Sequence, residues 1–160
     1  MSSQAHTVVG SPIGPLTAVE DAGHLVTLYL RPPEAPEDLG VRDDARFGAL
    51  ADQLAQYFAG TRTTFELPLR ASGNAFQRAV WRLIADIPYG GTRSYGDLAR
   101  ALGDRSLAQA VGVACGRNPL PIVVPCHRVV GADGALVGFG GGLDRKRFLL
   151  DLEQRDERLF

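Results

Sequence analysis

The stretch PIVVPCHRVVG, residues 121–131, places a cysteine next to a histidine, Cys126 and His127, between two short runs of branched apolar residues. Runs of this kind are typical of buried segments. Pro125 has no backbone N–H and interrupts a strand, so we expect the thiol at a strand end or in a sharp turn, where its sulfur can face a pocket. The stretch therefore predicts that Cys126 is a nucleophile.

A cysteine nucleophile needs help to lose its proton. A thiol with an ordinary pKa of about 8.5 is only a few per cent thiolate at neutral pH. Adjacent residues on an extended chain point to opposite faces, so His127 can serve Cys126 only at a turn or through one water. Glu153 is the candidate carboxylate to orient the imidazole. The residues alone leave two reactions open, a Cys-His hydrolase and another thiol transfer, and the adjacency of cysteine and histidine disfavours the hydrolase.

Length and composition narrow the class of protein. The chain has 160 residues, of which 45% are hydrophobic, enough for one domain or two small ones. Its apolar runs are far shorter than a bilayer span and its N-terminus lacks the features of a signal peptide, so we expect a cytoplasmic protein with no membrane partner.

The cysteines predict neither a metal nor a cofactor. Cys115 and Cys126 form no CxxC motif and no cluster at zinc spacing. Their spacing leaves a disulfide open, whereas a reducing compartment and the Cys-His dipeptide favour free thiols. Cys115 lies in an apolar helical pattern and is interpreted as a buried core residue. A position lining the reactive pocket is the alternative for Cys115.

The charge distribution indicates a nucleic-acid partner for the C-terminal half. The net charge of −1 argues against such a partner, but residues 1–70 carry 5 basic and 9 acidic side chains, whereas residues 71–160 carry 12 and 9. A locally basic surface is what a phosphate backbone requires. Sixteen of the seventeen basic residues are arginine, the side chain suited to bidentate phosphate contacts.

The N-terminal half predicts an antiparallel sheet with one helix. Residues 7–30 alternate β-rich stretches with Ser-Pro, Gly-Pro and Asp-Ala-Gly turns, and the Pro-rich acidic residues 31–40 form an exposed loop. Apolar residues recur at helical spacing over residues 43–58, and Gly60 stops this helix. Residues 64–69 are expected to form another short strand. The polar break that follows places a domain boundary between residues 1–73 and 74–160.

The C-terminal half predicts helices. A helix over residues 75–87 begins at Asn74, and two short helices starting at Ser94 and Ser106 match a helix-turn-helix, a pattern that an ordinary helical hairpin also satisfies. The six glycines of residues 131–142 are typical of a flexible hairpin, and their spacing does not match a dinucleotide site. A last helix covers residues 143–152. The fold class is therefore α+β: a small domain of antiparallel sheet plus helix, and a mainly helical domain that carries the Cys-His stretch.

At this point a family resemblance appears. The motif PCHRVV, preceded by SYGDLA and GRNPLPIVV and followed by GGLDRKRFLLDLE, resembles the O6-alkylguanine-DNA alkyltransferase family over residues 75–153, and residues 1–73 resemble its smaller domain more weakly. The resemblance implies single-turnover DNA repair, in which the thiolate takes the alkyl group from O6 of a guanine turned out of the duplex and keeps it. The implied partner is double-stranded DNA carrying alkylated guanine, which the protein is expected to bind as a monomer. Activity on O4-alkylthymine and cooperative binding stay open.

The resemblance also implies roles for individual residues. Cys126 matches the alkyl acceptor, His127 its water-linked base, Glu153 the acid that polarises the histidine, and Asn118 the asparagine that supports the site's backbone. The expected contacts to DNA and to the lesion base come from Ser94, Tyr95, Gln109, Ala110, Arg128, Val129, Gly138, Phe139, Gly140 and Gly141.

One departure from the family pattern concerns the flipping step. The second short helix carries Gln109 where the family usually has an arginine that fills the gap left by the extruded nucleotide. Glutamine forms hydrogen bonds but lacks the charge and the planar fork. This departure keeps a second hypothesis open, a protein that binds or flips lesions without repairing them. A helix-turn-helix regulator is a third, and it would need base contacts that the small side chains of this helix are poorly suited to make.

Overall fold

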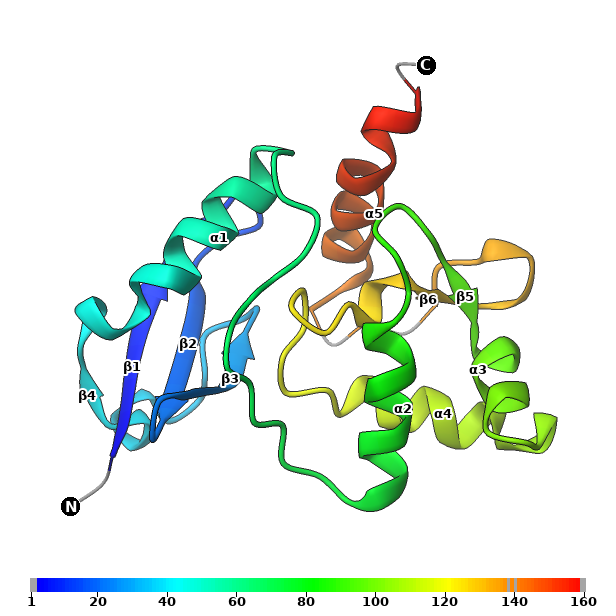
Figure 1. Ribbon diagram of the computed structural model, residues 1–160, viewed down its shortest axis with the longest axis horizontal. Helices are drawn as coiled ribbons and strands as arrows, with labels where there is room; N and C mark the ends of the chain where they lie inside the picture. The colour runs from blue at the N-terminus through cyan, green and yellow to red at the C-terminus, as the bar shows by residue number, and fades with distance from the viewer. Residues whose placement is uncertain (1–2, 138, 140, 159–160) are drawn as a thin grey trace. The chain divides into compact units, whose positions relative to one another are not determined.

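The chain folds into two compact units, Met1–Ser72 and Gly73–Phe160, each described here by itself (Figure 1). The computed structural model describes residues 3–137, 139 and 141–158. A mainly antiparallel sheet with one helix in the first unit and mostly helices in the second confirm the predicted α+β class.

The sheet of the first unit is built from the predicted meander. Strands β1 (Gln4–Val9), β2 (Leu16–Asp21) and β3 (His24–Tyr29) pair antiparallel, and the short β4 (Val41–Arg42) lies parallel to β1, giving the order β3-β2-β1-β4. β4 escaped prediction because two residues carry no periodicity.

One helix provides the apolar partner of this sheet. The loop of residues 31–40 contains the 3₁₀ turn η1 (Pro36–Leu39), and the predicted helix begins as the 3₁₀ turn η2 (Asp44–Phe47) before the α-helix α1 (Gly48–Phe58). Its buried side chains recur every three or four residues, as the sequence predicted: Phe47, Leu50, Leu54 and Tyr57. Gly60 follows with a φ of 80°, the left-handed conformation that ends many helices.

The strand predicted for residues 64–69 does not form. Only Leu69 makes an isolated bridge to Leu25, through hydrogen bonds from Leu25 N to Pro68 O (2.8 Å) and from Arg70 N to Leu25 O (3.0 Å). Pro68 has no N–H to give to a ladder, which limits the pairing beside β3. The β-rich composition of TFELPL was therefore misleading.

Gly40 lies where a side chain has no room, and this gives a stability prediction. Its φ is 83°, and a Cβ placed there would lie 2.1 Å from the carbonyl oxygen of Gln4 on β1. We expect Gly40→Ala to lower the free energy of unfolding by about 2–4 kcal/mol, measured by urea titration. Gly10→Ala is the matched control, since a Cβ at Gly10 meets no atom within 4 Å, and a loss at Gly10 as large as at Gly40 would contradict the steric explanation.

The second unit begins with the helices that the caps predicted. Helix α2 (Ala75–Ala85) starts at Asn74, whose side chain accepts from Gln77 N while the Gln77 side chain accepts from Asn74 N, a complete capping box. Helix α3 (Tyr95–Ala101) starts in the same way from Ser94 with Asp97.

Helix α4 (Ala108–Gly116) begins later than expected. Ser106 lies inside a 3₁₀ turn, η3 (Arg105–Leu107), and donates its backbone N–H to Asp104 Oδ1 at 2.9 Å. Asp104 therefore caps η3, Leu107 precedes α4 without a side-chain cap, and the assignment of a capping role to Ser106 was wrong. An aspartate two positions before a serine offers two capping oxygens, and the sequence does not decide between them.

The remaining segments bring the Cys-His stretch next to the helices. A single 3₁₀ turn, η4 (Cys126–Arg128), leads into β6 (Val129–Val130), which pairs parallel with β5 (Arg93–Ser94). The turn η5 (Ala132–Gly134) follows, and helix α5 (Leu143–Arg158) packs against η4. Trp81 of α2 donates its indole N–H to Ala114 O of α4 at 2.9 Å, which fixes these two helices to each other.

Candidate active site

Cys126 lies at the first position of η4, directly after a tight turn. Val124 N donates to Leu120 O at 2.8 Å, and Cys126 N donates to Val124 O at 2.7 Å. Ile122, in this turn, has a φ of 74°, a conformation rarely adopted by β-branched residues. Ile122 is fully buried, so packing of its side chain holds the strained backbone. The thiol therefore lies directly after a turn, which is one of the two positions predicted from Pro125.

The Cys126 thiol is enclosed and protonated at rest. Burial raises its pKa to about 11. A hydrogen bond with the Asn118 side chain and the positive charge of Lys146 oppose this rise. A protonated thiol is a weak nucleophile. Reaction at Cys126 therefore requires a base that takes its proton.

Asn118 connects the end of α4 with the turn before the cysteine. Its Nδ2 donates to Val124 O at 2.8 Å, and its Oδ1 accepts from Leu120 N at 2.9 Å. Because both ends of the amide are used, the Asn118 side chain fixes the turn that precedes Cys126.

His127 and Glu153 form a buried pair behind the cysteine. The two side chains are fully enclosed, and His127 Nε2 lies 2.6 Å from Glu153 Oε2. Burial lowers the pKa of His127, an effect that the hydrogen bond and charge of Glu153 oppose. Burial alone would raise the pKa of Glu153, but its partners His127 and Arg128 lower it to about 2. A neutral imidazole beside an ionised carboxylate carries its proton on Nε2, so the other ring nitrogen, Nδ1, is left as an acceptor.

Nδ1 of His127 is the atom that this arrangement makes basic. Within the described part of the chain it is the buried side-chain nitrogen or oxygen that has no hydrogen-bond partner. Buried polar atoms are nearly always paired, so an unpaired one at a reactive centre indicates a functional position. A buried acceptor of this kind is what proton transfer from a thiol requires of a general base.

Arg128 faces inward, at odds with our expectation that it contacts DNA. Its Nε donates to Glu153 Oε1 at 2.7 Å, its Nη2 to Glu153 Oε2 at 3.1 Å, and its Nη1 to Ile87 O at 2.7 Å. The side chain is 8% exposed. A guanidinium that satisfies a buried carboxylate in this way is not available to a phosphate.

Lys146 is a residue of this site that the sequence reasoning missed. It is fully buried on α5, and its ammonium donates to Val129 O at 2.6 Å and to Val137 O at 2.9 Å. Its charge acts on both Cys126 and Cys115. A signal was present, because Lys146 is the one lysine of a chain whose other sixteen basic residues are arginine.

Tyr95 lies on the same side of the site as the two cysteines. Its ring lies over Gly112 of α4, where an added Cβ would be 3.8 Å away, and its hydroxyl donates to Val137 O at 3.3 Å. Burial raises the pKa of Tyr95 to about 12, and the neighbouring thiols of Cys115 and Cys126 add to this effect. The hydroxyl therefore stays protonated and remains a hydrogen-bond donor.

The other predicted contact residues lie around this centre or on the α4 surface. Gln109 and Ala110 are exposed in the first turn of α4, Ser94 is used as a helix cap, and Val129 is buried. Phe139 is partly exposed, and the carbonyl of the buried Gly141 accepts from Arg145 at 2.8 Å. The predicted positions Gly138 and Gly140 lie outside the described residues.

The described residues contain no group of three or more His, Cys, Asp or Glu side chains placed to hold a metal ion. Nor do they contain a helix long and apolar enough to cross a membrane.

The first unit is a sheet domain. The second unit contains the helix-turn-helix and encloses a cysteine beside a buried His-Glu pair. This combination is typical of a protein that reacts through one thiol. Two family descriptions match the chain: the 6-O-methylguanine DNA methyltransferase DNA binding domain over residues 75–155, and the ribonuclease-like domain of the same methyltransferase over residues 5–71. The chain belongs to the 6-O-methylguanine DNA methyltransferase family.

Individual relatives are similar over nearly their whole length. Methylated-DNA–protein-cysteine methyltransferases of Mycolicibacterium paratuberculosis and Mycobacterium bovis are 48% and 45% identical, over 94% and 93% of this chain and 92% of each relative. The crystal structure of the Mycobacterium tuberculosis O6-methylguanine methyltransferase superimposes with a TM-score of 0.88 at 44% identity, over 95% of this chain and 93% of that one. The structure of M. tuberculosis OGT in complex with DNA gives 0.87 at 44% identity, over 94% and 93%.

Proposed function

We propose that this chain repairs double-stranded DNA by moving an alkyl group from O6 of guanine to Sγ of Cys126, once per protein molecule. The observation that carries the proposal is the enclosed Cys126 beside the His127–Glu153 pair, 2.6 Å apart, in a unit that matches the family's DNA-binding domain. Relatives named methyltransferases support this proposal over a protein that only binds lesions.

The reaction balances without a cofactor. The sulfur forms a bond to the alkyl carbon, the bond between that carbon and O6 breaks, and O6 keeps the electron pair. The thiol proton passes to Nδ1 of His127, and the guanine takes up one proton as it returns to its ordinary form. The hydroxyl of Tyr95, whose pKa is raised to about 12, remains protonated and is suited to donate a hydrogen bond to the lesion base.

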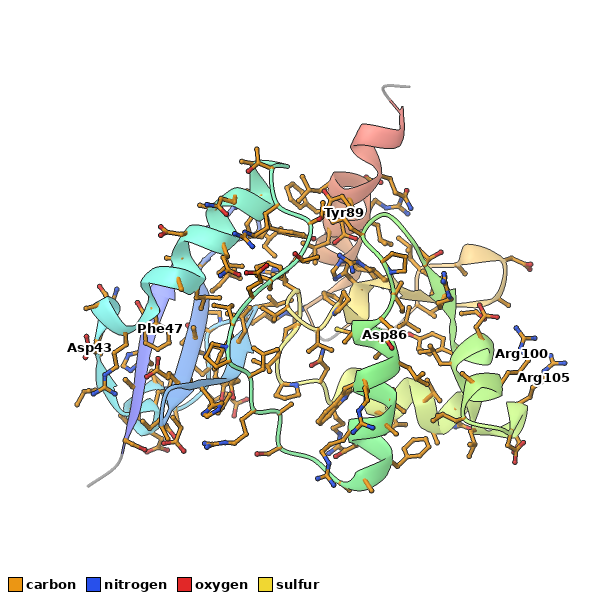
Figure 2. All side chains as sticks on the ribbon, viewed as in Figure 1. Asp43, Phe47, Asp86, Tyr89, Arg100 and Arg105 are labelled. Atoms are coloured by element: carbon orange, nitrogen blue, oxygen red, sulfur yellow. The ribbon has the colours of Figure 1, made fainter. Side chains whose placement is uncertain are left out.

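The exposed face of the helix-turn-helix is suited to the DNA backbone. Arg100 and Arg105 project from α3 and η3 into solvent (Figure 2). Arg100 also pairs with Asp97 on the same helix. Exposed arginines hold phosphates without reading sequence, and small residues on α4 allow a close approach to the minor groove. We assign DNA binding and alkyl acceptance to residues 74–160 and propose that the protein acts as a monomer in the cytoplasm.

The direct test is intact mass spectrometry after incubation with a duplex oligonucleotide that carries one O6-methylguanine. We expect a gain of one methyl group, with peptide mapping at Cys126 and not at Cys115. A gain of no more than one methyl group per protein molecule, even with excess lesion, would support a single reaction per molecule. No gain over hours at equal concentrations would refute the proposal. The same assay with O4-methylthymine defines the substrate range, and binding titrations with sedimentation test the monomer.

Gln109 gives a further prediction about nucleotide flipping. Its side chain is exposed at the start of α4, where an arginine would add a charge and a planar fork that fills the gap in the duplex. We expect Gln109→Arg to tighten duplex binding by about five- to tenfold, since one charged contact is worth about 1 kcal/mol or more. Repair in duplex should accelerate more than repair in single strands, as followed by quenched-flow kinetics. Gln109→Lys adds the charge without the fork, so equal gains for both variants would assign the effect to charge alone.

A further inference from the structure

Arg128 is the third member of the buried cluster, and its contacts are more extensive than those of a simple ion pair. It donates to both oxygens of Glu153, at 2.7 and 3.1 Å, while the same Oε2 lies 2.6 Å from His127. The third donor goes to Ile87 O at 2.7 Å, and the guanidinium carbon lies 5.7 Å from the centroid of the Tyr89 ring. Both contacts come from the segment after α2, where Figure 2 labels Tyr89, so this segment holds Arg128 in place.

The proton count of the cluster depends on Arg128. A carboxylate as enclosed as Glu153 needs a positive partner. With Arg128 present, that charge is supplied by the guanidinium, and the imidazole of His127 need not supply it. Without Arg128, the His127–Glu153 pair would bind one more proton at a higher pH.

The extra proton would remove the base wherever it resides. If it binds the imidazole, His127 is doubly protonated and Nδ1 carries a hydrogen. If it binds Glu153, the acid donates to Nε2, and the neutral ring must then carry its own hydrogen on Nδ1. In either case Nδ1 has lost the lone pair that accepts the thiol proton.

We infer that Arg128 is a positioning residue, which holds Glu153 ionised and oriented so that His127 stays a neutral base with a free lone pair on Nδ1. The inference rests on the proposed function and adds a residue to it. The charged groups that act on His127 are Glu153 and Lys146 from α5 and Arg128 from its own turn. The segment after α2, which also packs here, contributes the uncharged carbonyl of Ile87. The ammonium of Lys146 donates to the carbonyls of Val129 and Val137.

The first test measures protonation and does not depend on activity. ¹⁵N NMR of the imidazole follows Nδ1 of His127 as the pH is lowered. We expect Nδ1 to be unprotonated at pH 7 in the unmodified protein. In Arg128→Gln, protonation of Nδ1 should move to higher pH by about one pH unit or more. An unchanged titration in this variant would overturn the inference. So would a protonated Nδ1 at pH 7 in the unmodified protein, a result that needs no variant to fold.

The second test is the pH profile of methyl transfer under single-turnover conditions. We expect Arg128→Gln to lose at least about fivefold more rate at pH 6.5 than at pH 8.5, because the base is lost first at low pH. Arg128→Lys keeps the charge and should restore most of the rate at pH 6.5. Arg46→Gln makes the same change at an exposed ion pair with Asp43 in the first unit and should leave the profile unchanged. A purely structural role for Arg128 would lower the rate equally at both pH values, and this outcome would refute the inference.

The two proposals fail in different ways. If the unmodified protein takes up no methyl group, the proposed function fails. If it does, and Arg128→Gln keeps both the titration of His127 and the shape of the profile, only the role of Arg128 fails.

Discussion

Replacing Cys126 by serine is expected to abolish methyl transfer while lesion binding remains. Serine has nearly the volume of cysteine, so the enclosed site should keep its packing. Its hydroxyl, however, is a far weaker nucleophile than a thiol, and the buried His127 is too weak a base to ionise it. The expected loss is on the order of a thousandfold or more in the single-turnover rate, measured by intact mass with O6-methylguanine duplex.

The second thiol provides the matched control for this substitution. Cys115 is also buried, and burial raises its pKa to about 12. It lies on α4 without the His-Glu pair behind it. Cys115→Ser should therefore still take up one methyl group at Cys126. A methyl gain that persists in Cys126→Ser and disappears in Cys115→Ser would move the acceptor to Cys115.

The fold was predicted where one residue type decides the local structure. Asn74 and Ser94 have side chains that satisfy free backbone N–H groups at helix starts, and both helices begin where these residues predicted. Prediction failed where the partner is distant in the chain. Residues 64–69 have the composition of a strand. Whether they pair with β3 depends on the backbone hydrogen bonds available at the β3 edge and at Pro68, and the local sequence does not contain this information.

The candidate site shows the same division between local and distant information. The pairing of His127 with Glu153, 26 residues apart, was a candidate from the residues and was implied by the family resemblance, and the structure brings the two together. Arg128 was expected to contact DNA because the family resemblance implied it. Only the packing of α5 and of the segment after α2 turns it inward. The direction of a long side chain is set by tertiary partners, not by its neighbours in the chain.

Glu153→Gln is expected to slow methyl transfer by about 10²- to 10⁴-fold, the range of a lost general base. The amide has almost the shape of the carboxylate, but its NH₂ group is a donor. Arg128 offers only donors, so it takes the amide oxygen and leaves the NH₂ group facing His127 Nε2. The imidazole must then accept at Nε2 and carry its hydrogen on Nδ1, the wrong tautomer for a base. Single-turnover kinetics at pH 8 measure the loss, and Asp43→Asn, which neutralises a partly exposed carboxylate in the first unit, is the control.

The same substitution should also lower stability at neutral pH, by about 3 kcal/mol, since it leaves the buried charge of Arg128 uncompensated. In the folded protein the pKa of Glu153 is about 2, below its usual value of 4.5. A carboxyl group with a lowered pKa contributes stability above the unfolded value and loses it as the pH falls toward the folded one. The unmodified protein should therefore lose its advantage over Glu153→Gln between about pH 4.5 and pH 2. Urea titrations of both proteins at pH 7, 4 and 3 measure this difference. A difference that stays constant across this range would mean that the charge of Glu153 does not stabilise the fold.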